Sequence, residues 1–238
     1  MSRKLTAIQL GETEYDEALA LQKALAGRVA SSDERFFLLL NHPPIITIGR
    51  RGTDDNIVAS VGSLRSRGIT VREVDRGGDV TFHGAGQIVG YPVIDLRERR
   101  RDIHAYLRDL ESVMIEAVRR FSLTAHRVKG LTGIWVGEEK LGAIGVAVRR
   151  WVTYHGFALN VNTDLDYFSA IVPCGITDRG VTSMAKLCGC TVGEERVREA
   201  LVEEFATAFD FGEVVELRPR SVGELRDTLE LGEDSADG

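Results

Sequence analysis

A single cysteine stands out in this chain because its neighbours favour an exposed thiol. Cys174 lies between Pro173 and Gly175, and such a flank predicts a sharp bend that presents the sulfur at the mouth of a site. The reactive form of cysteine is the thiolate, which a neighbouring cation stabilises. The alternative is a small buried thiol, which is how most free cysteines behave.

Lys140 is the candidate cation. It opens a run of small and apolar residues, Leu141 to Gly145, and an ammonium in such surroundings loses hydration, which lowers its pKa and allows it to move protons. Because lysine is seldom buried, the alternative is a lysine at a strand end whose amine reaches solvent. A second short segment follows at residues 155–160. Its histidine, His155, is either a functional residue or simply a polar side chain with its hydrogen bonds satisfied.

A glycine-rich segment with a histidine covers residues 76–87. Its four glycines allow a ligand to approach the backbone N–H groups closely. Hairpin turns use the same residues, so an ordinary turn remains an equal alternative. Cys188 and Cys190 resemble half of a metal site, but no second ligand pair has suitable spacing, so we expect no metal.

Composition narrows the class of protein. The 238 residues are 43% apolar, enough for a substantial core in one domain. No apolar run approaches a membrane span or a secretory signal, and an odd number of cysteines is typical of reduced thiols, so a cytoplasmic protein is expected. The formal charge of −6 gives no basic excess of the kind that nucleic-acid binders carry.

The charge is concentrated at the C-terminus. Residues 224–238 hold six carboxylates and one arginine, which predicts an acidic tail that frays in solvent. The expected organisation is therefore a catalytic domain over residues 1–223 and a disordered tail over 224–238. Arg97, Arg99, Arg100 and Arg101 form a separate basic run, either a solvated surface or a docking edge.

Local patterns predict the elements that position these residues. Thr13 and Asp16 resemble a capping box that opens a helix ending near residue 30, and Asp102 is predicted to cap a helix with a clear 3.6-residue apolar period. Residues 194–209 form a further helix, and residues 132–160 are predicted to form three consecutive antiparallel strands. Other strands are expected at 5–10, 36–40, 45–48, 69–74 and 87–94. This order predicts a single α+β domain in which helices cover a largely antiparallel or mixed sheet.

Taken together, the motifs closely resemble the lipoyl(octanoyl) transferase family of lipoate biosynthesis. The resemblance runs along most of the chain, and only beyond residue 205 does it fade. The family usually has proline where this chain has Ala85, a departure that puts the rigidity of that loop in doubt. The segments that carry the resemblance are His42-Pro43-Pro44 with Thr47 and Gly49, Arg76-Gly77-Gly78, His83-Gly84-Ala85-Gly86-Gln87, Tyr91-Pro92 and Pro173-Cys174-Gly175-Ile176.

The resemblance implies a fold similar to the catalytic domains of biotin and lipoate protein ligases. It also implies that Cys174 carries the acyl thioester and that Lys140 lowers its pKa. A Cys/Lys pair is physically suited to acyl transfer, and backbone N–H groups near Gly77 and Gly78 are expected to stabilise the oxyanion. The implied acyl-binding residues are Arg76, Gly77, Gly78, Asp79, Val80, Thr81, Phe82, His83, Ala143, Ile144, Gly145, Gly156, Phe157 and Ala158.

The expected reaction moves an octanoyl group from octanoyl-acyl carrier protein to Cys174 and then to a lysine of a lipoyl domain, in 2-oxoacid dehydrogenases or the glycine cleavage H protein. A thioester donor and an amide product require no ATP, metal or other cofactor. Two alternatives remain: a lipoate or biotin ligase that adenylates a free acid, and a non-enzymatic acyl-binding module. Nucleic acid and membrane are not expected partners.

Overall fold

The computed structural model describes residues 3–172 and 179–232, whose core is a mixed sheet. Within these residues the main sheet has eight strands in the order β11-β1-β2-β6-β10-β9-β8-β7. β1 is parallel to β11 and β2, and the remaining neighbours are antiparallel. The strands of this sheet are β1 (Lys4–Glu12), β2 (Phe36–Asn41), β6 (Gln87–Val93), β7 (His126–Val128), β8 (Leu131–Val136), β9 (Glu139–Arg149), β10 (Val152–Asn160) and β11 (Glu213–Leu217).

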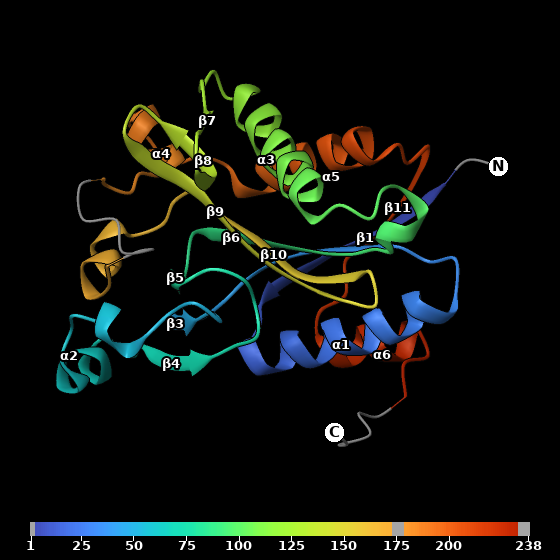
Figure 1. Cartoon of the computed structure of the whole chain (residues 1–238), viewed down its shortest axis with the longest axis horizontal. Coiled ribbons are helices and arrows are strands. Elements are labelled where there is room, and N and C mark those ends of the chain that lie inside the picture. The colour runs from blue at the N-terminus through green and yellow to red at the C-terminus, as the bar shows by residue number, and fades with distance from the viewer. Residues whose placement is uncertain (1–2, 173–178, 233–238) are drawn as a thin grey trace.

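Helices cover both faces of the main sheet, as Figure 1 shows. α3 and α5 lie on one face and α1 and α6 on the other. This confirms the predicted α+β domain with a mixed sheet covered by helices. The helices are α1 (Tyr15–Ser31), α2 (Val61–Ser66), α3 (Ile103–Arg119), α4 (Met184–Cys188), α5 (Glu194–Phe209) and α6 (Val222–Thr228), with 3₁₀ turns at Asp54–Asn56, Leu96–Glu98 and Leu165–Ala170.

β2 illustrates why its sequence is apolar without alternation. Phe37 and Leu39 pack under α3 and α5, whereas Phe36, Leu38 and Leu40 pack against the α1 face. A strand buried on both faces needs apolar side chains at every position. The run of five apolar residues therefore identifies a central strand.

A smaller sheet stands beside the main one and carries part of the site. β3 (Ile45–Ile48) pairs in parallel with β4 (Thr70–Glu73) and antiparallel with β5 (Val80–His83). Its apolar side chains pack with residues of α2 and of the 3₁₀ turn Leu165–Ala170 in a separate cluster. The predicted strands were all found, but their division between two sheets was not foreseen.

Helix caps followed the prediction in one case and departed from it in another. Asp102 accepts a hydrogen bond from the Ala105 backbone N–H at 3.0 Å, as a helix cap should. Thr13 instead donates to the carbonyl of Gly11 at 3.2 Å, and Glu14 precedes α1 without a side-chain cap. The predicted capping box at Thr13 and Asp16 is therefore wrong, because the threonine hydroxyl closes the turn after β1 instead.

The predicted acidic tail also needs correction. Residues 222–228 form α6, in which Val222 and Leu225 are buried against the α1 face of the sheet. The boundary expected at residue 223 thus cuts through a packed helix, since Leu225 contributes to the core despite the charges around it. Residues 233–238 lie outside the described residues.

No helix in residues 3–172 and 179–232 combines the length and the apolar run that crossing a membrane requires.

Candidate active site

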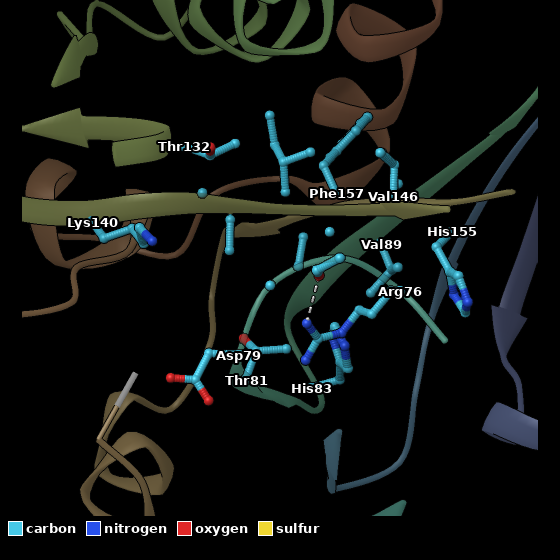
Figure 2. A pocket seen from close by; sticks show the side chains of 18 of the residues that line it. Arg76, Asp79, Thr81, His83, Val89, Thr132, Lys140, Val146, His155 and Phe157 are labelled. Carbon is cyan, nitrogen blue, oxygen red and sulfur yellow. Dashed lines mark hydrogen bonds between the residues drawn. The ribbon is translucent and has the colours of Figure 1, made fainter. Parts of the chain in front are cut away.

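A cavity of about 540 Å³ lies where the glycine-rich segment, β5, β9 and β10 meet (Figure 2). Every predicted pocket residue except Phe82 lines it, and Lys140 lies at its edge. Further lining residues that the sequence did not single out for this role are Tyr15, Arg51, Gln87, Val89, Tyr91, Ile103, Leu107, Gly130, Leu131, Thr132, Gly142, Val146, His155, Asn160, Phe168 and Val181.

Arg76 is fixed by the smaller sheet. Its Nη2 donates to the carbonyl and the hydroxyl of Thr47 at 2.7 and 2.9 Å, and its Nη1 donates to the carbonyl of Gly77 at 3.0 Å. Thr47 is fully buried on β3. The guanidinium is therefore a preorganised cation in the cavity wall rather than a mobile surface charge.

The glycines allow this loop to pack closely on the main sheet. A Cβ atom at Gly145 would lie 2.8 Å from the carbonyl oxygen of Gly77 and 2.9 Å from Cδ of Arg76. Gly78 has a φ of 94°, a left-handed backbone that favours glycine. The glycine-rich segment is therefore more than a turn: it is a loop of the site, called the site loop below, whose Gly77 carbonyl and Arg76 side chain pack directly on Gly145 of β9.

One expectation about this loop is wrong in part. The N–H of Gly77 donates to the carbonyl of Val146 at 2.8 Å, at the edge of β9 that β8 leaves unpaired beyond residue 142. It is therefore engaged in holding the loop and is not a donor for an oxyanion. That role stays a prediction for Gly78.

The predicted acyl-binding residues divide between two faces of the sheet. Ala158 packs with the α1 face, whereas Ile144 and Phe157 pack with the α3 and α5 face. Figure 2 shows Phe157, Val146 and Thr132 on one side of β9, and Lys140, Arg76, His83 and His155 on the other. The cavity thus has an apolar part near α3 and a polar part near Arg76.

Phe82 does not line the cavity. Its ring stacks on Tyr167 at 4.8 Å and meets Phe168 edge-on at 5.6 Å, inside the core of the smaller sheet. Phe82 faces the side opposite Thr81 and His83, as strand alternation predicts, whereas Val80 packs in the same cluster as Phe82 and still lines the cavity. The implied pocket should therefore omit Phe82.

Lys140 is half-buried at the end of the cavity opposite His155 (Figure 2). Its Nζ lies 5.0 Å from the centroid of the Trp135 ring, a cation–π distance. The backbone N–H of Lys140 donates to the carbonyl of Gly180 at 2.9 Å, and the backbone carbonyl of Lys140 accepts from the Thr182 N–H at 3.0 Å. Both peptide groups of Lys140 are thus joined to the segment that follows residue 178.

Cys174, the predicted nucleophile, lies outside the described residues. The chain is tied at both flanks of that gap: Val172 N–H donates to the carbonyl of Asn56 at 2.8 Å on one side, and Gly180 bonds Lys140 on the other. Cys188 and Cys190 are exposed free thiols. Among the described residues, no three histidine, cysteine or acidic side chains gather as metal ligands.

Two buried histidines belong to the polar side of the site: His83 lines the cavity, and His42 does not line it but is hydrogen-bonded to the lining residue Tyr91. The Nδ1 atom of His42 lies 2.7 Å from the carbonyl oxygen of Thr13, and its Nε2 atom lies 2.7 Å from the Tyr91 hydroxyl. A carbonyl only accepts, so Nδ1 carries the proton and the tyrosine donates to Nε2. Burial lowers the pKa of His42 to about 4, so the imidazole is neutral at pH 7.

His83 is held in the same way by Gln87. Its Nδ1 atom lies 2.7 Å from the Gln87 amide oxygen, which makes Nδ1 the donor and leaves Nε2 as an acceptor. Burial, with a smaller effect of the His42 charge, lowers the pKa of His83 to about 3. This histidine is therefore a neutral hydrogen-bond acceptor in the cavity wall.

Asp75 anchors the start of the site loop to β10. It accepts hydrogen bonds from His155 Nε2 at 2.8 Å and from the Tyr154 hydroxyl at 2.5 Å. The His155 hydrogen bond is the main cause that holds the pKa of the Asp75 carboxyl well below its usual range. His155 has a φ of 54°, a left-handed backbone, and its buried Nδ1 has no hydrogen-bond partner in the described part of the chain.

Solved structures of similar architecture identify the fold of this protein. A putative lipoate protein ligase from T. acidophilum with bound lipoic acid has a TM-score of 0.73 at 20% identity, covering 94% of this chain and 95% of that one. A lipoate-protein ligase A bound with ATP has a TM-score of 0.77 at 19% identity, covering 97% and 95%. The chain therefore has the lipoate-protein-ligase fold.

Sequence comparison defines the family within that fold. The model of the lipoyl protein ligase A/B catalytic domain matches residues 14–206, and the chain belongs to this family. An octanoyltransferase of Caldicellulosiruptor bescii is 50% identical over 203 residues, covering 84% of this chain and 89% of the relative. An octanoyltransferase of Solibacter usitatus is 49% identical over 204 residues, covering 85% and 92%.

Proposed function

We propose that this chain is an octanoyltransferase of lipoate biosynthesis that carries the octanoyl group as a thioester on Cys174. The enzyme class rests on the family match and on relatives of 43–50% identity that bear the name octanoyltransferase. The covalent step and the identity of the donor are the finer parts of the proposal.

The position of Lys140 is the observation that best supports the mechanism. Lys140 lies at the edge of the cavity, and its N–H and carbonyl bond residues 180 and 182, a few positions after Cys174. An ammonium beside a thiol favours the thiolate and so raises the nucleophilicity available at neutral pH. The arrangement suits thioester exchange at a cysteine.

In the first step, the Cys174 thiolate attacks the carbonyl carbon of octanoyl-acyl carrier protein. The thioester bond of the donor breaks, the octanoyl group forms a thioester with Cys174, and Lys140 gives a proton to the leaving carrier thiolate. In the second step, the amine of a lipoyl-domain lysine attacks the enzyme thioester. An amide forms, the Cys174 thiolate leaves, and Lys140 recovers a proton from the amine.

The cavity supplies surroundings for both the acyl chain and the reacting carbonyl. Ile144, Phe157 and Leu107 provide apolar surface near α3, while Arg76 and the neutral His83 provide polar contacts on the other side of β9. The donor arrives as a thioester and the product is an amide, so the reaction as proposed uses no ATP and no metal.

The proposed acceptors are lipoyl domains of 2-oxoacid dehydrogenases and the glycine cleavage H protein. A solved relative of this fold, 21% identical, is described as a bi-partite lipoate protein ligase with its E2 lipoyl domain from Thermoplasma acidophilum. We also propose that the reaction takes place in the cytoplasm, where exposed free thiols such as Cys188 and Cys190 stay reduced.

A two-substrate assay tests this function against a ligase activity. One reaction contains octanoyl-acyl carrier protein and a lipoyl domain without ATP, and the other contains free octanoate, ATP and the same lipoyl domain. Octanoylated domain is expected only in the first reaction. Product in the second reaction alone would identify an adenylating ligase and overturn the proposal.

A further inference from the structure

A buried chain of amide groups connects the site loop to the segment that flanks Lys140. Gln87 at the start of β6 and Asn160 at the end of β10 are both buried. Gln87 Nε2 donates to the Asn160 Oδ1 atom at 2.9 Å and to the carbonyl of Phe82 at 3.1 Å, while its Oε1 accepts from His83. Asn160 Nδ2 donates onward to the carbonyl of Thr182 at 3.0 Å.

This series of hydrogen-bonded amides ends at Thr182, in the segment that is bonded to Lys140. Residues 180 and 182 each make one backbone hydrogen bond to Lys140, and Val181 between them forms an isolated parallel bridge with it. Two backbone bonds to a single residue form a short ladder. The Asn160 amide adds a third link, which ties residue 182 to the interior of the main sheet.

Asparagine is required at this position for a simple chemical reason. One amide group must accept from Gln87 and donate to Thr182 at the same time, so both ends of the side chain are used. Aspartate lacks the donor. An apolar residue would leave the Gln87 N–H and the buried Thr182 carbonyl each without that partner.

We infer that Asn160 is a positioning residue of the transfer reaction, which sets the segment after Cys174 in register with Lys140. This inference rests on the proposed function of Cys174 and Lys140. Asn160 acts through the Thr182 backbone, so its loss alters the environment of the Cys174 thiol without removing a reacting group.

Asn162 provides a matched control two residues further along. Its amide also bonds in both directions, with Nδ2 donating to the carbonyl of Val192 at 2.8 Å and Oδ1 accepting from Val192 N–H at 2.9 Å. It anchors the approach to α5 rather than the segment at Lys140. A purely structural role for such amides predicts the same consequences at both positions.

The test compares Asn160→Ala with Asn162→Ala in the full chain. Two quantities are measured: the pH dependence of Cys174 alkylation by iodoacetamide, followed on the peptide that contains Cys174, and kcat for octanoyl transfer. Asn160→Ala is expected to move the alkylation profile to higher pH and to lower kcat on the order of tenfold to a hundredfold, the scale of misplaced reacting groups. Asn162→Ala is expected to change neither.

Equal profiles and equal kcat values in the two variants would overturn the inference. If Asn160→Ala does not fold, Asn160→Leu, which keeps the side-chain volume, is compared in the same way. A different result would overturn the proposed function itself: the unaltered protein, whose Cys174 is alkylated, transfers no octanoyl group to the lipoyl domain.

Discussion

At the scale of the residue, the charge of Lys140 is the feature on which the proposed chemistry depends. Lys140→Met keeps most of the side-chain volume and removes the ammonium. Because a cation within a few ångströms lowers a thiol pKa by one unit or more, alkylation of Cys174 at pH 7 should slow about tenfold or more. Octanoyl transfer should fall with it.

Lys186→Met is the matched control for that change. Lys186 forms an ion pair with Glu139 at 2.7 Å, one residue before Lys140 in the chain, and its side chain is half exposed. Its loss should leave the alkylation profile of Cys174 unchanged. A wild-type pH profile in Lys140→Met would show that Lys140 does not activate the thiol.

The buried histidines predict how stability depends on pH. The pKa of His42 is lowered to about 4 and that of His83 to about 3, whereas an unfolded histidine titrates near 6.5. Below pH 6.5 the unfolded chain binds more protons, so the stability present above that pH is lost as the pH falls. Asp75, with its lowered pKa, adds to the loss only below its unfolded value near 4.

His42→Gln removes one of these titrations. Between pH 6.5 and pH 5, each histidine that stays neutral in the fold should cost about 1.6 kcal/mol of unfolding free energy. Urea unfolding of the variant should therefore show a pH dependence shallower by about that amount. Identical slopes for the variant and the unaltered protein would contradict the neutral assignment of His42.

At the scale of the element, replacing either of two glycines by alanine is expected to change the stability of the protein in opposite directions, because their surroundings differ. A Cβ at Gly156 on β10 would lie 2.0 Å from the carbonyl oxygen of Gly90 on β6, whereas a Cβ at Gly27 in α1 meets nothing within 4 Å. Gly156→Ala must push two central strands apart and should lower Tm. Gly27→Ala should stabilise the protein by about 0.5–1 kcal/mol.

Thermal unfolding of the two alanine variants provides the measurement. The opposite signs follow from packing alone, because both changes add the same methyl group. A rise in Tm for Gly156→Ala would mean that β6 and β10 are not as close as described.

Elements with strong local signals were predicted well. The helix after Asp102 was expected from its cap and its apolar period, the helix at 194–209 from its apolar period, and the three strands within residues 132–160 from their short turns. Those signals arise from neighbouring residues. The parallel pairing of β11 with β1 joins residues more than two hundred positions apart, and no local pattern specifies such a contact.

The lining of the site was predicted only in part, because which side chains face the cavity depends on how the strands are oriented and paired. Strand alternation was not applied to residues 80–83 or 143–145, although it would have placed Phe82 on the face opposite Thr81 and His83, and Ile144 on the face opposite Gly145. His155 could not have been placed by alternation, because Tyr154 and His155 both reach Asp75. Its left-handed φ of 54° breaks the two-residue period, and the sequence shows no glycine at that position.

At the scale of the whole molecule, the basic run before α3 is partly structural. Arg99 donates to the carbonyl of Ala208 at 2.9 Å and to Asp109 at 3.1 Å, and its guanidinium lies 4.7 Å from the Phe209 ring centroid. Arg97 forms an ion pair with Asp95. A charge reversal at Arg99 would therefore disturb the contact with α5 as well as any docking surface.

Arg101 is the better probe of steering by charge. It is exposed just before α3, and Arg119, whose side chain is 76% exposed, lies at the other end of the same helix. If this edge attracts an acidic carrier, Arg101→Glu should raise KM for octanoyl-acyl carrier protein at low salt and reduce its salt dependence, whereas Arg119→Glu should not. Equal KM values for both variants would mean that Arg101 does not steer the carrier.

The most direct test of the proposed mechanism is intact-protein mass spectrometry of the enzyme after incubation with octanoyl-acyl carrier protein. The thioester mechanism predicts a mass increase of one octanoyl group that maps to Cys174, is removed by hydroxylamine and disappears when lipoyl domain is added, as the domain gains the same mass. Cys174→Ala should show neither adduct nor transfer. Octanoyl transfer at the wild-type rate by Cys174→Ala would contradict the covalent mechanism.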